Sequence, residues 1–184
     1  TYGYCWLLKS LTFPDHAFEG KVSALSVVIQ LCFVYGAYWP LDYWFMANNL
    51  GPDTVNIPPH ILGLGVALHT IGCSLCNLAD FQVNLTLKLK RGLINCGLYR
   101  YCRNPNYLGE ITIYLAYCVM LQHWYGYACM GAIWFCLFYT RMLIKDESLS
   151  RYPDFPEWKA QSGLLFPWFP AFLTGSKLRH EKAP

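Results

Sequence analysis

Charged residues are scarce in this chain. Asp, Glu, Lys and Arg make up 14% of the 184 residues, hydrophobic residues make up 55%, and the mean hydropathy is +0.24. An ordinary soluble domain has about 25% charged residues, so the composition argues against that class and favours an integral membrane protein. The length suits one domain rather than two. Internal repeats and coiled-coil heptads are also missing, which argues against a repeat array or a long coiled coil.

Basic residues are missing from residues 47–59 and from the turn at Gln122. If the chain crosses a membrane four times, all 14 Lys and Arg lie on the opposite face, with Arg141 snorkelling towards it. This asymmetry predicts that the basic face lies in the cytoplasm or its topological equivalent. The net charge of +3 then reflects topology. No basic stripe with interleaved aromatic residues is present, so we expect no nucleic-acid partner.

Four apolar runs are long enough, or nearly so, to cross a bilayer core of about 30 Å. They are residues 22–46, 60–79, 107–121 and 125–144. Only Gln122, His123 and Trp124 separate the last two runs, which predicts a tight helical hairpin. The expected fold class is all-α: an integral membrane bundle of about four transmembrane helices, with a closing helical hairpin and an interfacial C-terminal tail.

Aromatic side chains near both ends of the sequence predict segments that lie at the membrane surface. We expect an interfacial N-terminal segment at 1–21, a membrane domain at 22–170 and a flexible tail at 171–184. Trp158 and Phe166 would seat the C-terminal part at the interface. The sequence begins at Thr1 without a methionine, so we expect that the true N-terminus lies upstream or has been processed.

Cysteine is abundant, with nine residues, and most of them lie inside the apolar runs. Cys73 and Cys76 have the spacing of a redox or metal pair, but they lie within a span and have no histidine in register. Cysteine in such surroundings behaves as a small hydrophobic residue. We therefore expect packing at this pair and no metal site in the protein.

The polar segment 80–106 precedes the third apolar run. Residues 85–90 alternate between leucine and polar residues, which predicts an extended or interfacial stretch. Asn104 and Pro105 are suited to the N-cap and first position of a helix. Asn106 and Glu110 would then share one helix face near a positive helix end, an arrangement that suits an anionic ligand.

Three blocks of the sequence carry a resemblance to a known family. They are NLADFQ at 77–82, GLYRYCRNPNYLGE at 97–110, and the stretch from Trp158 to Pro170 that ends in FPWFP. Together they resemble the membrane family of steroid 5α-reductases, sterol reductases and their uncharacterised relatives (DUF1295-like). Isoprenylcysteine carboxyl methyltransferases are its more distant relatives. The resemblance covers roughly residues 75–170.

The resemblance implies an NADPH-dependent reductase acting on a C=C bond of a lipid or sterol-type substrate, and it implies a set of cofactor-binding residues. By this resemblance Asp80, Asn106 and Glu110 would hold the amide and ribose parts of NADPH. Lys88, Arg103 and Arg141 would face its phosphates, Tyr107 would line the pocket, and Asp146 or Glu147 would fix the adenosine end. No residue is assigned to the chemical step.

Two other functions stay open. One is a methyltransferase that uses S-adenosylmethionine and acts on a lipid or prenyl group, because the Arg and Lys cluster beside a helix N-terminus does not distinguish NADPH from S-adenosylmethionine. The other is a non-catalytic accessory subunit that retains this fold, binds no cofactor and packs against other membrane subunits. Membrane lipids are the expected surroundings in every case. We expect the endoplasmic reticulum membrane, with the mitochondrial inner membrane as the alternative.

Overall fold

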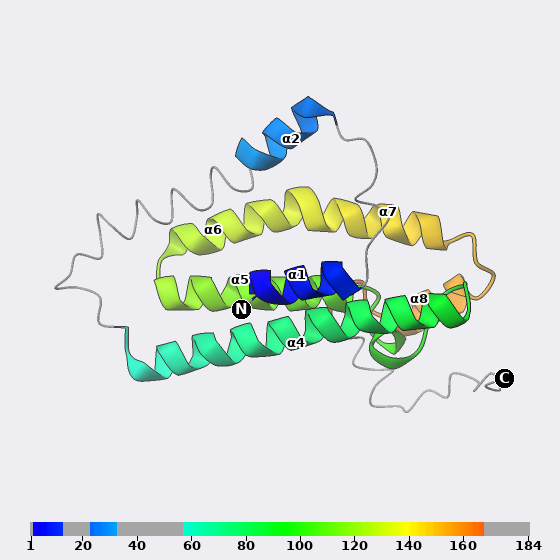
Figure 1. The fold of residues 1–184 in the computed structure, drawn as a ribbon, viewed down its shortest axis with the longest axis horizontal. Helices are drawn as coiled ribbons and strands as arrows, with labels where there is room; N and C mark the ends of the chain where they lie inside the picture. The colour runs from blue at the N-terminus through cyan, green and yellow to red at the C-terminus, as the bar shows by residue number, and fades with distance from the viewer. Residues whose placement is uncertain (1, 13–22, 33–56, 168–184) are drawn as a thin grey trace. The chain divides into compact units, whose positions relative to one another are not determined.

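The computed structural model describes residues 2–12, 23–32 and 57–167, which are almost entirely helical (Figure 1). The N-terminal helices are α1 (Tyr2–Thr12) and α2 (Ala24–Gln30). The remaining elements are α4 (Pro59–Leu89), η3 (Gly97–Arg100), α5 (Pro105–Leu121), α6 (Trp124–Ile133), η4 (Trp134–Tyr139), α7 (Thr140–Leu149) and α8 (Phe155–Gln161). Within these described ranges the fold is all-α, and one isolated bridge takes the place of a sheet.

The chain divides into two compact units. Unit 1 comprises residues 1–70 and 113–136, and unit 2 comprises residues 71–112 and 137–184. Most of the first expected span, 22–46, lies outside the described residues, as do the expected tail at 171–184 and part of the N-terminal segment. The cofactor residues expected from the resemblance all belong to unit 2, which is therefore the part of the fold that positions the site.

Helix α4 is longer than the sequence pattern predicts. The second apolar run begins as expected, but the helix continues ten residues past Ala79 and ends at Leu89. The expected extended stretch at 85–90 is therefore wrong for all but its last residue. The side chain of Asn84 bonds back to the carbonyl of Asp80 within the helix, and Lys88 in the last turn complements the helix dipole.

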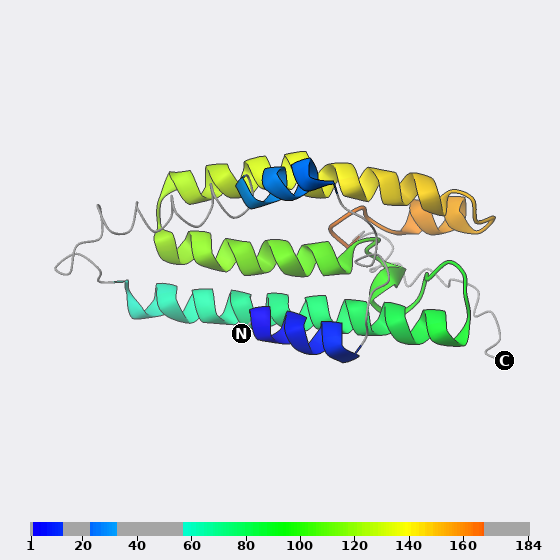
Figure 2. The ribbon, with the colours of Figure 1, turned by 45° about the horizontal axis from the view of Figure 1, so that its top comes forward.

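In unit 1, α4 packs closely against α5 (Figure 2). A Cβ atom on Gly65 would lie 2.6 Å from the side chain of Met120, so the glycine permits the approach. The rings of His69 and Tyr117 meet edge to face at 5.7 Å. The side chains of His69 and Tyr117 are thus used for packing between α4 and α5.

The hairpin between α5 and α6 is confirmed in its position. Helix α5 ends at Leu121, and Gln122 takes a positive φ of 51° to reverse the chain. His123 then caps α6, because its Nδ1 accepts a hydrogen bond from the backbone N–H of Tyr125 at 3.2 Å. A two-residue connection of this kind forces the two helices to run antiparallel.

Two helical segments are long and apolar enough to cross a membrane: Pro59–Leu89, and the continuous stretch Trp124–Leu149. Their apolar windows are only 22% and 6% buried, unlike the core helix of a soluble protein. Helix α5, the third expected span, has 17 residues. The described part of the chain therefore supports a helical membrane protein with two candidate spans, and the four-helix bundle remains a prediction.

Unit 2 has its own hydrophobic core. Ala79, Tyr99, Phe155 and Trp158 form its buried centre, and side chains of the loop after α4 pack around them. Trp158 is only 2% exposed, so the expectation that it lies at the membrane interface is wrong. Its indole is instead part of the core that holds the loop and α8 together, whereas Phe166 is exposed.

Candidate functional site

The three sequence blocks meet in unit 2. The side-chain amide of Gln82 donates to the carbonyl of Cys96 at 2.7 Å and accepts from the backbone N–H of Leu98 at 3.0 Å, joining the first block to the second. The indole N–H of Trp158 donates to the carbonyl of Tyr99 at 2.8 Å, joining the third block to the second. Segments as far apart in the sequence as those of Gln82 and Trp158 are therefore held in one structure.

Backbone hydrogen bonds tighten the same junction. Arg103 N–H donates to the carbonyl of Gly163 at 2.9 Å, and Gly163 N–H donates to the carbonyl of Tyr101 at 2.9 Å, which makes a short parallel bridge. The Cys102 thiol donates to the carbonyl of Leu165 at 2.8 Å. The loop that leads into α5 is thus fixed against the segment that follows α8.

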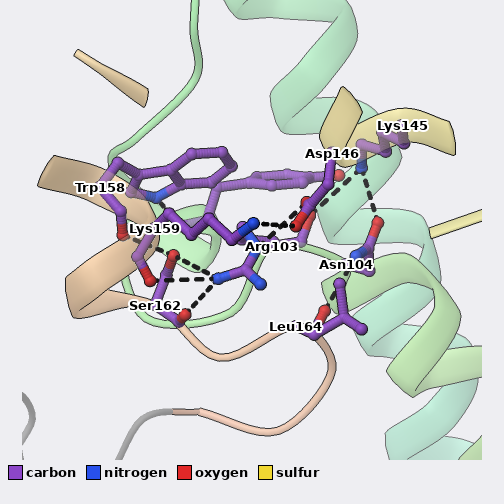
Figure 3. A network of polar contacts seen from close by, with 9 residues as sticks. Arg103, Asn104, Lys145, Asp146, Trp158, Lys159, Ser162 and Leu164 are labelled. Atoms are coloured by element: carbon purple, nitrogen blue, oxygen red, sulfur yellow. Dashed lines mark hydrogen bonds and ion pairs between the residues drawn. The ribbon is translucent and has the colours of Figure 1, made fainter. Parts of the chain in front are cut away.

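Arg103 is the centre of a buried polar network (Figure 3). Its Nε lies 3.1 Å from Oδ1 of Asp146, and the two residues are 6% and 7% exposed. Its Nη1 donates to the carbonyl and hydroxyl of Ser162 and, at 3.3 Å, to the carbonyl of Lys159. Lys159 adds a weaker ion pair to Asp146 at 3.9 Å. Arg103 and Asp146, which the resemblance assigns to the phosphates and to the adenosine end of the cofactor, contact each other.

Asn104 lies beside this network and is completely buried. Its carbonyl accepts the N–H of Leu108 at 3.1 Å, so it begins α5 as expected. Its side chain does not cap the helix: Nδ2 donates to the carbonyl of Leu164 at 2.8 Å, and Oδ1 accepts from Nζ of Lys145 at 3.0 Å. Lys145 also donates to the carbonyl of Arg103 at 3.2 Å, so this lysine holds the start of α5 in place.

A second group of polar residues lies near Tyr107. The charges of Arg141, Glu110 and Asp80 all lie within electrostatic range of its hydroxyl, and its ring packs edge to face on Phe138 at 5.3 Å. Four of the expected cofactor residues are therefore brought together by α4, α5 and α7. We call Asp80, Tyr107, Glu110 and Arg141 the Tyr107 cluster.

Asn106 lies next to this cluster on α5. Its backbone carbonyl accepts the thiol of Cys76 at 3.0 Å. Its side-chain Oδ1 is buried and has no hydrogen-bond partner among the described residues. A buried acceptor without a partner is costly and needs an explanation, and a bound donor is one.

The other two expected cofactor residues, Lys88 and Glu147, are exposed on α4 and α7. Lys145 was not predicted as a site residue, although it lies four residues after Arg141 and shares its helix face. Tyr99, which is 3% exposed in the core of unit 2, was not predicted either. Helical spacing was the signal for Lys145, whereas nothing local marked Tyr99.

The buried thiol of Cys102 predicts a loss of stability in alkali. Burial raises the pKa of Cys102 from 9.0 to about 11. From pH 9 to pH 11 the unfolded chain gives up this proton while the folded protein keeps it. The free energy of unfolding should therefore be at its full value below pH 9 and fall by up to about 1.4 kcal/mol per pH unit towards pH 11.

Thermal unfolding in detergent, followed between pH 7 and pH 11, checks this prediction. Cys102→Ala should show a smaller loss of stability above pH 9 than the unmodified protein. Cys96→Ala is the matched control, because Cys96 is an exposed free thiol in the same unit. Equal slopes in all three proteins would contradict the role given to Cys102.

Comparison with known protein families shows the family of this chain. No curated protein and no solved structure matches the chain. Residues 20–160 match a family whose description names no activity. The matched range contains the Tyr107 cluster, Asn106 and most of the polar network around Arg103. Since it covers well over half of the sequence, the protein belongs to the family described as "Protein of unknown function (DUF1295)".

Proposed function

We propose that this protein is a membrane-embedded reductase that binds NADPH and reduces a C=C bond of a lipid or sterol-type substrate. One observation carries the proposal: the charges of the Tyr107 cluster lie within electrostatic range of the Tyr107 hydroxyl, and the preceding residue, Asn106, has a buried Oδ1 without a partner among the described residues. The cluster lies in unit 2, in which the three blocks that resemble steroid and sterol reductases are joined. The endoplasmic reticulum is the membrane that we propose for it.

The residues present suit the parts of this cofactor. The unpaired Oδ1 of Asn106 can accept an N–H of the nicotinamide carboxamide. The carboxylates of Asp80 and Glu110 accept hydrogen bonds from ribose hydroxyls, and the exposed cations Arg141 and Lys88 suit phosphates. Bound NADPH supplies the hydride, and the protein contributes orientation and an apolar site that excludes water.

Arg103 has a different part in this proposal from the one that the resemblance implies. In the structure, Nε and Nη1 of Arg103 donate hydrogen bonds to Asp146, Ser162 and Lys159. We therefore propose that Arg103 is a positioning residue, which holds the loop that leads into α5. The direct contacts to phosphate then fall to Arg141 and Lys88.

Substitutions in the Tyr107 cluster should weaken NADPH binding. Glu110→Gln removes a charge that would hold ribose, and Arg141→Met removes a cation that would face phosphate. We expect each change to raise the Kd at least tenfold, about 1.4 kcal/mol, in titrations of detergent-purified protein. Arg151→Met is the control, because Arg151 is exposed beside Tyr152 outside the cluster. Unchanged affinity in both variants would rule out this site.

The nucleotide that the purified protein retains tests the cofactor directly. The protein is denatured, and the released material is analysed by mass spectrometry. NADP(H) at about one per chain is the result that we expect. S-adenosylmethionine in its place would overturn the proposal and favour lipid or prenyl methyl transfer.

A second candidate function is a non-catalytic subunit that keeps the fold. The ion pair between Arg103 and Asp146 favours it, because two of the expected cofactor residues neutralise each other. A folded protein that releases neither nucleotide and purifies only with other membrane subunits would support this function over the reductase.

A further inference from the structure

The end of α4 and the loop after it carry positive charge alone. Residues 81–100 include no Asp or Glu and four basic residues: Lys88, Lys90, Arg91 and Arg100. Lys90 and Arg91 are both exposed, and within the described residues neither forms an ion pair. Neither has a part in the proposed NADPH site, so their charge is available for another partner.

Exposed apolar side chains lie directly before these two cations. Phe81, Leu85 and Leu89 are 46%, 42% and 89% exposed. They are spaced four residues apart, so they lie along one side of α4. A different side of the helix, which carries Ala79 and Val83, packs against the core of unit 2. The last turns of α4 therefore present an apolar stripe that the core of unit 2 does not cover.

The length of α4 relates this end of the helix to the membrane surface. Helix α4 runs without a break through 31 residues, so it is about 46 Å long (Figure 1). A bilayer with its headgroups is about 40–45 Å thick. Helix α4 is one of the two candidate spans. If it crosses the membrane, its last turn and the cations after it lie at the level of the lipid headgroups.

The side chains at this end suit a lipid whose headgroup is negatively charged. Lys and Arg can lay their apolar stems along lipid chains while their charged ends reach phosphate. Each cation near an anionic membrane surface raises the affinity about fivefold. A zwitterionic lipid has no net charge to attract them. Exposed leucines beside the cations suit the acyl chains of the same lipid.

We propose that Leu85, Leu89, Lys90 and Arg91 form a binding surface for an anionic phospholipid. Lys90 and Arg91 donate to the headgroup phosphate, and the two leucines contact an acyl chain. We call these four residues the α4 lipid surface. It is independent of the proposed NADPH site, so either can be wrong without the other.

The test measures lipid binding to the detergent-purified full chain by native mass spectrometry. Phosphatidylserine and phosphatidylcholine with the same acyl chains are titrated, and the affinity for the first bound lipid is compared. A cation variant, Lys90→Gln with Arg91→Gln, removes both charges. A leucine variant, Leu85→Gln with Leu89→Gln, removes the apolar contact and keeps residues that favour a helix.

The control is Arg151→Gln. Arg151 is exposed beside Tyr152 in the same unit, outside the α4 lipid surface. Lys88 stays unchanged in every variant, because the proposed function assigns it to NADPH. All variants should unfold at the temperature of the unmodified protein, since the substituted side chains are exposed.

We expect the unmodified protein to bind phosphatidylserine at least tenfold more tightly than phosphatidylcholine. The cation variant should lose at least tenfold in affinity for phosphatidylserine and keep its affinity for phosphatidylcholine. The leucine variant should bind both lipids more weakly, because both have the same acyl chains. Arg151→Gln should bind both lipids as the unmodified protein does.

Three results would overturn the inference. The first is equal affinity of the unmodified protein for the two lipids. The second is a loss of phosphatidylserine binding that is absent in the cation variant or as large in Arg151→Gln. The third is full phosphatidylserine affinity in the leucine variant together with binding of inorganic phosphate that the cation variant loses, because the surface would then be a site for small anions.

Discussion

Replacing Gly109 with alanine is expected to destabilise unit 2 by up to about 2 kcal/mol. A Cβ atom on Gly109 would lie 2.7 Å from the backbone N of Cys76 and 2.8 Å from the carbonyl oxygen of Gly72. Both atoms belong to the backbone of α4, which cannot move aside as a flexible side chain can. Overpacking of this kind typically costs about 1–3 kcal/mol and outweighs the gain of about 1 kcal/mol in helix propensity.

The control for this prediction is the same substitution at Gly63 and Gly131. Nothing lies within 4 Å of a Cβ atom at either position, so alanine should leave stability unchanged or raise it by up to about 1 kcal/mol. Unfolding by heat or denaturant in detergent, followed by circular dichroism, compares the three variants. If Gly109→Ala were as stable as Gly63→Ala, the close approach of α4 and α5 at Gly109 would be disproved.

Removing Arg103 should destabilise the protein more than the change at Gly109. Arg103→Met removes the ion pair with Asp146. The carboxylate of Asp146, a residue that is 7% exposed, then lacks its strongest partner. Breaking one member of a buried pair typically costs about 3–5 kcal/mol. The same change also removes the donors that reach Ser162 and Lys159, so the loop before α5 loses part of its attachment to α8 and the segment after it.

A double variant separates the cost of the unpaired charge from the cost of the lost contacts. Arg103→Met with Asp146→Leu leaves no unpaired carboxylate, so we expect it to regain part of the stability lost in the single variant. Arg151→Met, at an exposed arginine of the same unit, should stay within about 0.5 kcal/mol of the unmodified protein. A double variant less stable than Arg103→Met would show that the unpaired charge is not the main cost.

Local pattern predicted the parts of the fold that local interactions determine. The start of α5 at Pro105 follows from a residue type that favours this position, and the turn at Gln122 follows from the short gap between two apolar runs. The end of α4 was missed because the alternation at 85–90 is also compatible with a helix. Once a helix is formed, each added residue gains a hydrogen bond at little cost, so it continued to Leu89.

The candidate site was likewise predicted where local pattern or the resemblance pointed to its residues, and missed where distant contacts determine it. The spacing of Asn106 and Glu110 placed them on one helix face, and the resemblance supplied the other members of the Tyr107 cluster. The partners of Arg103 and Trp158 lie 43 and 59 residues away, so no local pattern could reveal them. Both side chains are used inside the protein, whereas the resemblance implied contact with phosphate for Arg103 and the residue type suggested the membrane surface for Trp158.

The bridge between Cys102 and Gly163 sets an order of events during biosynthesis. The loop that leads into α5 leaves the ribosome about 60 residues before the strand-like segment that completes it. Closing so long a loop has an entropic cost, which local helix formation does not share. Until that segment emerges, Arg103 and Asn104 lack the carbonyls that bind them in the finished structure. Nascent chains of this protein therefore carry an incomplete polar core for several seconds, at ordinary elongation rates of about 5–20 residues per second, and during this interval chaperones can recognise them.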